Sequence, residues 1–352
     1  MTLLGRSVHV RHVNLAAKLT HPLRMLNSYA LVSFKSTAAS LLKAFARSVP
    51  HGARRALTAG LSERDADRFE LLSYLAQAAG VDGFLVSGDY GSIQSSSQDT
   101  KVLRLYAETG RFAHRTNELL TAFFRDPAPA TYIDIGANIG LTTIPVAQFP
   151  HVSCLAIEPE PTNYQNLVAN VGRNCPHGNV RTRQLAVFRE AGTIQFELAT
   201  DNLGDHRLRL TQDVGAFQEQ DRRVITVEAA PLDAVTTDLS LNRVGIKIDV
   251  QGAEAFVFEG GRDTLARVGL LILEFWPYGI ARMKADPEVI LDVLESQFAT
   301  VALGVDEGAA LSAPATALEA TRQLRELMTT KAHDPYFYVD IVATQHSGAQ
   351  SK

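Results

Sequence analysis

Short apolar runs alternate with segments of helical period over most of the chain. Five runs are predicted to be strands, at Tyr132–Ile135, Val152–Ile157, Val180–Val187, Val244–Ile248 and Leu270–Glu274. Helices are predicted between them, at Leu141–Gln148, Thr162–Asn174 and Ala253–Gly260. This alternation is typical of an α/β fold in which helices cover both faces of a mostly parallel sheet. The pattern therefore predicts that fold class.

The C-terminal part continues the pattern with two helices and two strands. The helices are predicted at Pro287–Ser296 and Ala315–Met328, and the strands at Ala299–Val305 and Tyr336–Ala343. A long helix-containing connection between the last two strands fits a sheet edge that carries one antiparallel strand. Two further runs, Thr193–Leu198 and Val224–Ala229, are predicted as additional or edge strands.

The residues before this alternation predict a smaller N-terminal part. Ser62–Ala79 is predicted as a helix, with a capping-box pattern at its start and Gly80 after its end. Short strands and one more helix follow, at Gly83–Val86, Gly91–Gln94 and His114–Phe124. We expect three parts: a basic arm over residues 1–61, helical or weakly ordered; a helix with short strands packed on the core over 62–111; and the main domain over 112–352.

Charge is distributed unevenly along the chain. Residues 1–61 contain no Asp or Glu, and the whole chain has a net charge of -4, so the remainder is acidic. An acidic body argues against nucleic acid as a partner, because phosphate binding needs clustered Lys and Arg. A basic amphipathic helix is predicted within the arm at Ser36–Val49. It fits a helix packed on the main domain, a peripheral contact with an anionic membrane, or part of an organelle-targeting segment.

Composition adds little beyond the class of protein. Apolar residues make up 46% and charged residues 20%, as in a soluble enzyme, and the two cysteines lack metal-ligand spacing. No apolar run approaches the roughly 20 residues that span a bilayer, and the start does not match a secretory signal. We therefore expect a cytoplasmic location, with membrane contact through the arm as the alternative.

The most informative segment is the strand and glycine loop at Tyr132–Leu141. The strand carries Asp134 to the carboxyl edge of the sheet, where ligands of open α/β sheets bind. Gly136 permits a tight turn against a ligand, and Gly140 permits the next helix to begin close to the strand. A dinucleotide site would have G-x-G-x-x-G for its pyrophosphate, whereas this loop has G-x-x-x-G beside a carboxylate. A carboxylate suits an ammonium group, such as the aminoacyl end of S-adenosylmethionine.

The next strands end in further candidates for cofactor contact. Glu158 follows the second strand about 20 residues beyond the glycine loop, where an acid accepts hydrogen bonds from ribose hydroxyls. The alternative for Glu158 is a charge at a helix N-terminus. Ala186, near the end of the third strand, is a candidate for contact with the adenine ring.

The later strand ends supply candidates for the chemistry. Asp249 follows the strand Val244–Ile248 at the centre of the same edge, and Glu254 begins the next helix. Asp249 suits a substrate hydroxyl or the methionine part of the cofactor. Glu254 has two equally favoured interpretations: a residue of the site, or a charge that stabilises the helix dipole. Glu274 and Trp276 lie at the rim, where Trp276 is either a substrate wall or a core residue.

Taken together, these motifs resemble the FkbM family of methyltransferases. The resemblance rests on Ile133–Gly140, Ile157–Pro159, Ile246–Glu254 and Glu274–Phe275, within residues 89–343. It implies a class I methyltransferase (Rossmann-like) sheet of seven mostly parallel strands, with a mainly helical N-terminal extension here. It also implies S-adenosylmethionine as methyl donor and O-methylation of a sugar, glycolipid or polyketide-type acceptor.

The resemblance also implies roles for particular residues. By it, Asp134, Gly136, Asn138 and Gly140 line the methionine end of the cofactor, and Glu158 lines the ribose. At Gln251 the family more often has Glu, so this chain is expected to differ in how it handles its substrate.

Methyl transfer to oxygen needs alignment, exclusion of water and a nearby base. The candidate bases are Asp249 first, then His206, then Glu254. His206 lies in the long polar loop Ala199–Asp221, which we expect to form a lid over the acceptor. No metal site is expected, because no His accompanies the acids. Two alternatives stay open: a non-catalytic protein that binds the cofactor, and a nucleotide-dependent oxidoreductase.

Overall fold

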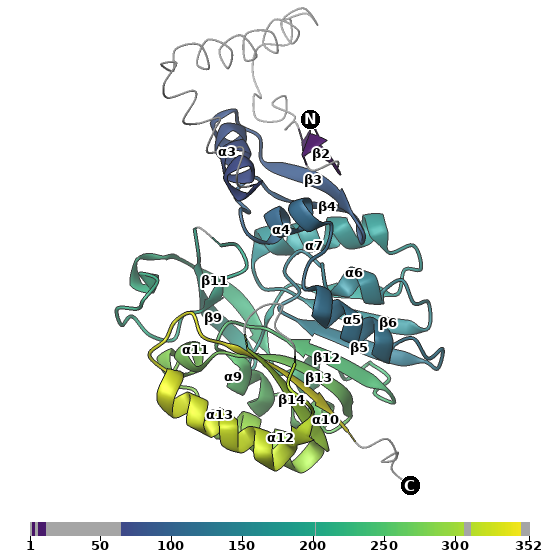
Figure 1. Cartoon of the computed structure of the whole chain (residues 1–352), viewed down its shortest axis with the longest axis vertical. Coiled ribbons are helices and arrows are strands. Elements are labelled where there is room, and N and C mark those ends of the chain that lie inside the picture. The colour runs from purple at the N-terminus through teal and green to yellow at the C-terminus, as the bar shows by residue number, and fades with distance from the viewer. Residues whose placement is uncertain (1, 4–5, 12–64, 201, 306–310, 346–352) are drawn as a thin grey trace, which may run out of the picture.

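The computed structural model describes residues 2–3, 6–11, 65–200, 202–305 and 311–345. Its main element is a central sheet of eight strands. Figure 1 shows how the helices and strands are arranged around it. Its strand order is β15-β14-β16-β13-β12-β5-β6-β7. The bounds are β5 Ala130–Ile135, β6 Val152–Ile157, β7 Val180–Arg183, β12 Val244–Ile248, β13 Val268–Phe275, β14 Thr300–Val305, β15 Ala315–Thr316 and β16 Val339–Thr344. Strands β7, β6, β5, β12 and β13 are parallel to one another, and β16 is antiparallel to both β13 and β14.

This topology confirms the predicted α/β fold of the class I methyltransferase type and refines its edge. The chain runs outward from β5 to β6 and β7, then returns to place β12 on the other side of β5. The order therefore reverses between β5 and β12, and the crevice at such a reversal is where open α/β sheets bind ligands. The antiparallel strand enters between β13 and β14. The sheet has eight strands rather than the seven predicted because the two-residue β15 pairs with β14.

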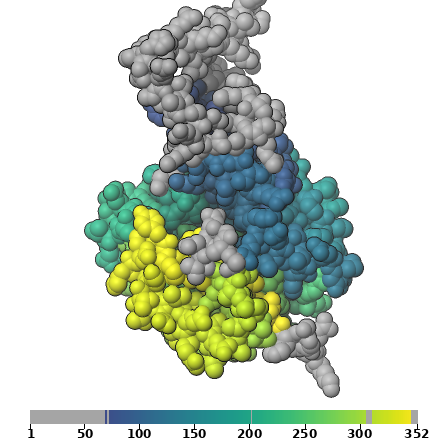
Figure 2. Space-filling view, in the orientation of Figure 1, coloured from purple at the N-terminus to yellow at the C-terminus, as the bar shows by residue number. Residues whose placement is uncertain are grey.

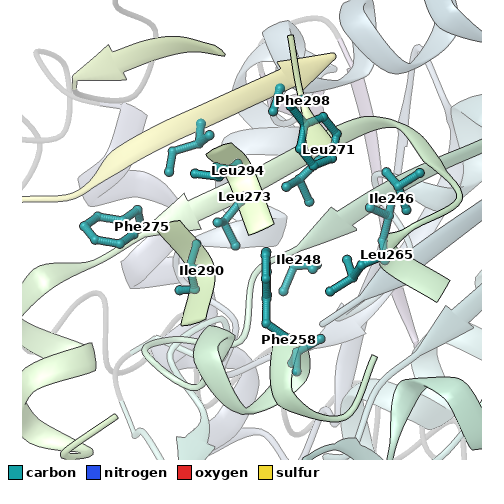
Figure 3. Packing of buried hydrophobic residues seen from close by; sticks show 14 of the residues in the cluster. Ile246, Ile248, Phe258, Leu265, Leu271, Leu273, Phe275, Ile290, Leu294 and Phe298 are labelled. Carbon is teal, nitrogen blue, oxygen red and sulfur yellow. The ribbon is translucent and has the colours of Figure 1, made fainter. Parts of the chain in front are cut away.

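Helices cover both faces of this sheet, as predicted. One face is covered by α9 Glu254–Glu259, α10 Arg262–Leu265, α12 Glu288–Gln297 and α13 Ala317–Lys331. Figure 3 shows side chains of β12 and β13 meeting those of α9, α10 and α12 in this layer. The other face is covered by α4 Val102–Thr109, α5 His114–Phe123, α6 Thr143–Val146 and α7 Pro161–Asn174. Figure 2 shows the yellow C-terminal helices and the blue segment with α4 and α5 dividing one surface.

A second sheet stands beside the first and was only partly anticipated. Its order is β10-β9-β11-β8, with β8 Ala186–Val187, β9 Gly192–Leu198, β10 Arg207–Leu208 and β11 Arg223–Ala230. The additional strands predicted near residues 193–198 and 224–229 are β9 and β11. The predicted single strand over residues 180–187 is wrong, because β7 ends at Arg183 and β8 pairs with β11 in the second sheet. The short helix α8 Leu232–Val235 connects β11 to β12, and a second short helix, α11 Pro277–Arg282, follows β13.

Where the N-terminal part is described, it contains strands as well as the helices that were predicted. A sheet of β1 Thr2–Leu3, β2 Arg6–Arg11, β3 Gly83–Gly88 and β4 Gly91–Ser96 accompanies α3 Asp65–Ala78. Strand β2 pairs with β3, so the start of the expected arm contributes a strand. The predicted helix at residues 36–49 and the capping residue Ser62 lie outside the described residues. Where the chain is described, none of its helices combines the length and apolarity of a membrane span.

A row of asparagines on α7 ties this unit to the central sheet. Asn170 accepts a hydrogen bond from the backbone N–H of Gln94 in β4, and its amide donates to the carbonyls of Gln94 and Ile139. One helical turn away on either side, Asn166 bonds the Gln94 side chain and Asn174 bonds the backbone of Ser92. Residues four apart lie on the same face of a helix, so all three asparagines of α7 face β4.

We expect Asn170→Ala to lower the free energy of unfolding by about 2–4 kcal/mol, because it leaves buried backbone groups of Gln94 and Ile139 unpaired. Urea denaturation measures the loss. Asn166→Ala is the matched control, since it removes one bond between partly buried side chains. Equal losses for the two variants would contradict the assigned role of Asn170.

Candidate functional site

The site begins where β5 ends in the glycine loop. Asp134 is fully buried, and its Oδ2 accepts hydrogen bonds from the hydroxyls of Thr142 and Thr143 at 2.7 and 2.6 Å. Its Oδ1 has no hydrogen-bond partner among the described residues. A buried carboxylate oxygen without a donor is costly, so Asp134 has capacity for a cationic or N–H group.

The glycines of this loop serve packing within the protein. Gly136 has φ +78°, and a Cβ there would collide with the carbonyl oxygen of Asp249. Gly140 has φ +92°, and a Cβ there would come within 2.9 Å of the Leu167 side chain in α7. The expected role of Gly136 in turning against a ligand is thus accompanied by another: it brings the ends of β5 and β12 together. Asn138 also has a positive φ of 50°.

Glu158, at the end of β6, joins this loop to the start of α7. Its Oε2 accepts a bond from the backbone N–H of Asn138, and its Oε1 accepts one from the N–H of Glu160, both at 2.9 Å. Burial raises the pKa of Glu158 to about 8. A carboxylate oxygen can accept more than one hydrogen bond, so the pair of oxygens can still receive two hydroxyl donors.

The unpaired atoms around the loop define what fits there. Besides Asp134 Oδ1, the amide oxygens Oδ1 of Asn138 and Asn163 are buried without partners in the described part of the chain. All three are acceptors, so they match a ligand that presents ammonium and hydroxyl groups and oppose a phosphate. S-adenosylmethionine carries an ammonium group and ribose hydroxyls, and the residues present therefore fit it.

Asp249 directly follows β12, the strand next to β5, and is more accessible than Asp134. Its side chain is 32% exposed, against none for Asp134. Lys247 Nζ donates to Asp249 Oδ2 at 3.1 Å and lies 3.9 Å from Asp134 Oδ1. Sequence reasoning missed Lys247, although a lone Lys between Ile246 and Ile248 in a buried strand was a usable signal. Burial alone would lower the pKa of Lys247, but Asp249 and Asp134 outweigh it and raise that pKa.

The other two candidate bases, Glu254 and His206, both accept hydrogen bonds from the backbone. Glu254 is fully buried, and its Oε1 accepts from the backbone N–H groups of Val250 and Gly252 at 3.1 Å. Burial raises its pKa to about 7. His206 accepts a bond at Nδ1 from the N–H of Ala199, and burial, with Arg222 and Arg207 nearby, lowers its pKa to about 4. The lone pair that His206 would use as a base is therefore already engaged.

The long loop after β9 lies against the glycine loop. The Leu203 carbonyl accepts a bond from Asn163 at 2.9 Å, and a Cβ on Gly204 would lie 3.5 Å from the Asn138 amide nitrogen. Residues 202–204 therefore stand next to the side chains predicted to contact the cofactor. This position agrees with a covering role for the loop.

A buried ionic cluster holds the base of that loop. Arg207 is 1% exposed and pairs with Asp205, Glu219 and Glu197. Its guanidinium also lies 4.7 Å from the ring centroid of Trp276, whose indole N–H donates to a backbone carbonyl. Trp276 is 5% exposed and packs as a core residue in this structure.

Ala186 is placed away from the end of the third strand. It pairs with Ala229 in the second sheet and packs among Phe188, Phe196 and Phe256. The end of β7 is instead formed by Arg183, whose carbonyl accepts from the Glu158 N–H. The placement of Ala186 therefore adds no support for an adenine contact. Among the described side chains, no group of three or more His, Cys, Asp or Glu is arranged to hold a metal ion.

Comparison with known proteins agrees with this geometry. Residues 134–299 match the methyltransferase FkbM domain. The chain is similar to methyltransferase sdnD of Sordaria araneosa, with 26% identity over 44% of this chain and 70% of the relative. It is also similar to the 2-O-methyltransferase NoeI of Sinorhizobium fredii, with 24% identity over 52% of this chain and 77% of the relative.

Solved structures of other methyltransferases show slight overall similarity. The METTL16 methyltransferase domain aligns with 80% of this chain over 80% of its own length, with a TM-score of 0.37 and 11% identity. The precorrin-6y C5,15-methyltransferase of Geobacter metallireducens aligns with 65% of this chain over 88% of its own length, with a TM-score of 0.34 and 12% identity. The domain match and the relatives show that the chain is a methyltransferase that uses S-adenosylmethionine, and its residues 134–299 are similar to the methyltransferase FkbM domain.

Proposed function

We propose that this methyltransferase transfers the methyl group to a hydroxyl oxygen of a sugar, glycolipid or polyketide-type acceptor. The observation that carries this proposal is the position of Asp249, a partly exposed carboxylate whose backbone touches the glycine loop at Gly136. A hydroxyl acceptor benefits from a nearby base, whereas an amine or thiolate needs one less. The name of the relative NoeI, a 2-O-methyltransferase, supports transfer to oxygen.

Asp134, Asn138 and Glu158 are proposed to hold the cofactor. The unpaired Oδ1 of Asp134 would receive its ammonium group, and the two oxygens of Glu158 would receive the ribose hydroxyls. Gly136 and Gly140 shape the loop that brings these side chains together. These assignments place the methionine end toward β12 and the nucleoside toward β6.

Asp249 is proposed to act as the base. When bound, S-adenosylmethionine supplies a methyl group on a positively charged sulfur, which leaves as a neutral thioether. As the acceptor oxygen forms its bond to the methyl carbon, Asp249 takes the hydroxyl proton. Lys247 balances the charge of Asp249 before this transfer and fixes the position of its Oδ2. The loop over residues 202–204 would exclude water from the crevice.

The domain limits and the arm extend this proposal. We propose a basic arm over residues 1–61, a packed N-terminal unit over 62–111 and a catalytic domain over 112–352. The arm is proposed to contact an anionic membrane surface that presents the acceptor. Because β2 pairs with β3, the test replaces basic residues beyond β2 with Gln rather than deleting the arm. Undiminished sedimentation with anionic vesicles would refute the membrane contact.

Calorimetric titration with S-adenosylhomocysteine tests the cofactor site. Ribose hydroxyls favour the ionised form of Glu158, whose pKa in the free protein is about 8. Binding therefore releases a proton, and the affinity should rise by up to about tenfold per pH unit between about pH 6 and 8. Glu158→Gln should weaken binding and remove this pH dependence. Absence of binding by the folded wild-type chain would refute the cofactor site.

A screen with a methyl-labelled donor tests the acceptor class. Sugar, glycolipid and polyketide hydroxyl compounds are offered to the full chain, and transferred label is measured. Binding of S-adenosylhomocysteine without transfer to any acceptor would favour a non-catalytic binding protein. Labelled products with methyl on nitrogen or sulfur would contradict the assignment to oxygen.

A further inference from the structure

Carboxylates from four neighbouring strands gather on one face of the sheet at its carboxyl edge. Residues paired between strands project to the same side, and alternate residues of a strand share a face. Lys247 pairs with Asp134, and Glu274 pairs with Asp340. Asp249 lies two residues beyond Lys247, so it shares that face. The charged groups here come from β5, β12, β13, β16 and α9: Asp134, Lys247, Asp249, Glu274, Asp340 and Glu254.

Lys247 compensates only part of this negative charge. Its ammonium contacts Asp249 and lies near Asp134, so it is placed between these two carboxylates. Glu274 stands further along the edge. Burial, together with the charges of Asp249, Glu254 and Asp340, raises the pKa of Glu274 well above its ordinary value. Two carboxylates that share a site cannot both ionise easily, and one of them keeps its proton.

Gln251 connects Asp249 and Glu274 directly. Its Nε2 donates to Asp249 Oδ1 at 2.8 Å and to Glu274 Oε1 at 3.0 Å. An amide nitrogen has two hydrogens, so one is used on each carboxyl group. A Glu or Met at this position has no such pair of donors.

The backbone at Gln251 is held in a strained conformation. Its φ is +58°, in the left-handed region that residues other than glycine seldom adopt. Conformations of this kind cost free energy and persist where the surroundings require them, often at functional sites. Gly252 follows with φ +97° and packs directly on Gly279, which keeps this turn tight. The turn thereby places the amide between the two carboxyl groups.

We propose that Gln251 is a positioning residue that joins Asp249 and Glu274 into one hydrogen-bonded unit. This inference rests on the proposed role of Asp249 in methyl transfer. By occupying Asp249 Oδ1, Gln251 turns the carboxylate so that its remaining lone pairs face the crevice. The unit presents acceptor atoms and negative charge, so it favours a neutral acceptor rich in hydroxyl groups and disfavours a carboxylated or phosphorylated one.

Carbon NMR of the full chain, labelled at the carboxyl carbons of Asp and Glu, tests the unit without any acceptor. Signals are assigned with Asp249→Asn and Glu274→Gln. In the wild type, Glu274 should remain protonated at neutral pH. Gln251→Met, of similar size but without donors, should shift the carboxyl signals of Asp249 and Glu274 at neutral pH, because both groups lose the hydrogen bond from Nε2. Gln251→Glu should also shift them, because it places a third carboxyl group where the donors were.

Circular dichroism and urea denaturation confirm that each variant is folded. Carboxyl signals of Asp249 and Glu274 that are the same in wild type, Gln251→Met and Gln251→Glu would overturn the proposal. For an acceptor found in the labelled-methyl screen, kcat should fall in both variants, with unchanged affinity for S-adenosylhomocysteine. Shifted signals without any methyl transfer would support the unit and refute the proposed function instead.

Discussion

Asp249→Asn is expected to reduce kcat for methyl transfer by about 10²–10⁴-fold, the usual contribution of a positioned base. The amide keeps the shape of the side chain but cannot take up the hydroxyl proton. It also leaves Lys247, which now donates to Asp249 Oδ2, without its closest carboxylate. The rate is measured with the acceptor identified by transfer of labelled methyl, at saturating donor.

If Asp249 acts on the acceptor, its substitution should lower kcat without changing the affinity for the cofactor product. The affinity of Asp249→Asn for S-adenosylhomocysteine should change little, because Asp134 and Glu158 hold the cofactor in this proposal. Asp263→Asn, at an exposed position in α10, is the matched control and should leave kcat unchanged. A kcat within threefold of wild type for Asp249→Asn would show that the base is elsewhere or is not needed.

Arg207→Met is expected to lower the free energy of unfolding by about 3–5 kcal/mol, the range for removing one partner of a buried ionic network. Arg207 is 1% exposed and pairs with Asp205, Glu219 and Glu197, of which Glu219 is fully buried. Methionine fills much of the volume but leaves these acids with less compensation. Urea denaturation followed by fluorescence of Trp276 measures the loss close to the substituted position, because Arg207 lies over the indole ring.

The control for this substitution is Arg209, which directly follows β10. Arg209 donates to the backbone carbonyls of Glu219, Gln220 and Arg222 and makes no ion pair among the described residues. Arg209→Met should therefore cost less than Arg207→Met. Arg207→Met should also weaken binding of S-adenosylhomocysteine, because the loop that it anchors brings Gly204 close enough to Asn138 that a Cβ there would lie 3.5 Å from the amide nitrogen. Equal stability of Arg207→Met and wild type would contradict the anchoring role.

The sequence by itself determined the fold class, most of the elements of the main domain and the acids at the strand ends. Strand β6 has the predicted bounds, and α5 and α7 differ from prediction by one residue at one end. This success has a local cause: hydrophobic period, proline, glycine and capping residues act within one element. Asp134, Glu158 and Asp249 follow apolar strands, and parallel strands bring their carboxyl ends to one edge whatever the details of packing.

Only the tertiary structure decided how those residues interact. The bridge that Gln251 makes between Asp249 and Glu274 joins two strand ends that are far apart in the sequence, as does the collision of a Cβ at Gly136 with Asp249. The position of Ala186 in the second sheet depends on its pairing with Ala229, more than forty residues away in the chain. Such contacts leave no periodic pattern in the chain, because each depends on the packing of several elements at once. The sequence therefore located the acids, and long-range packing determined their partners and their exposure.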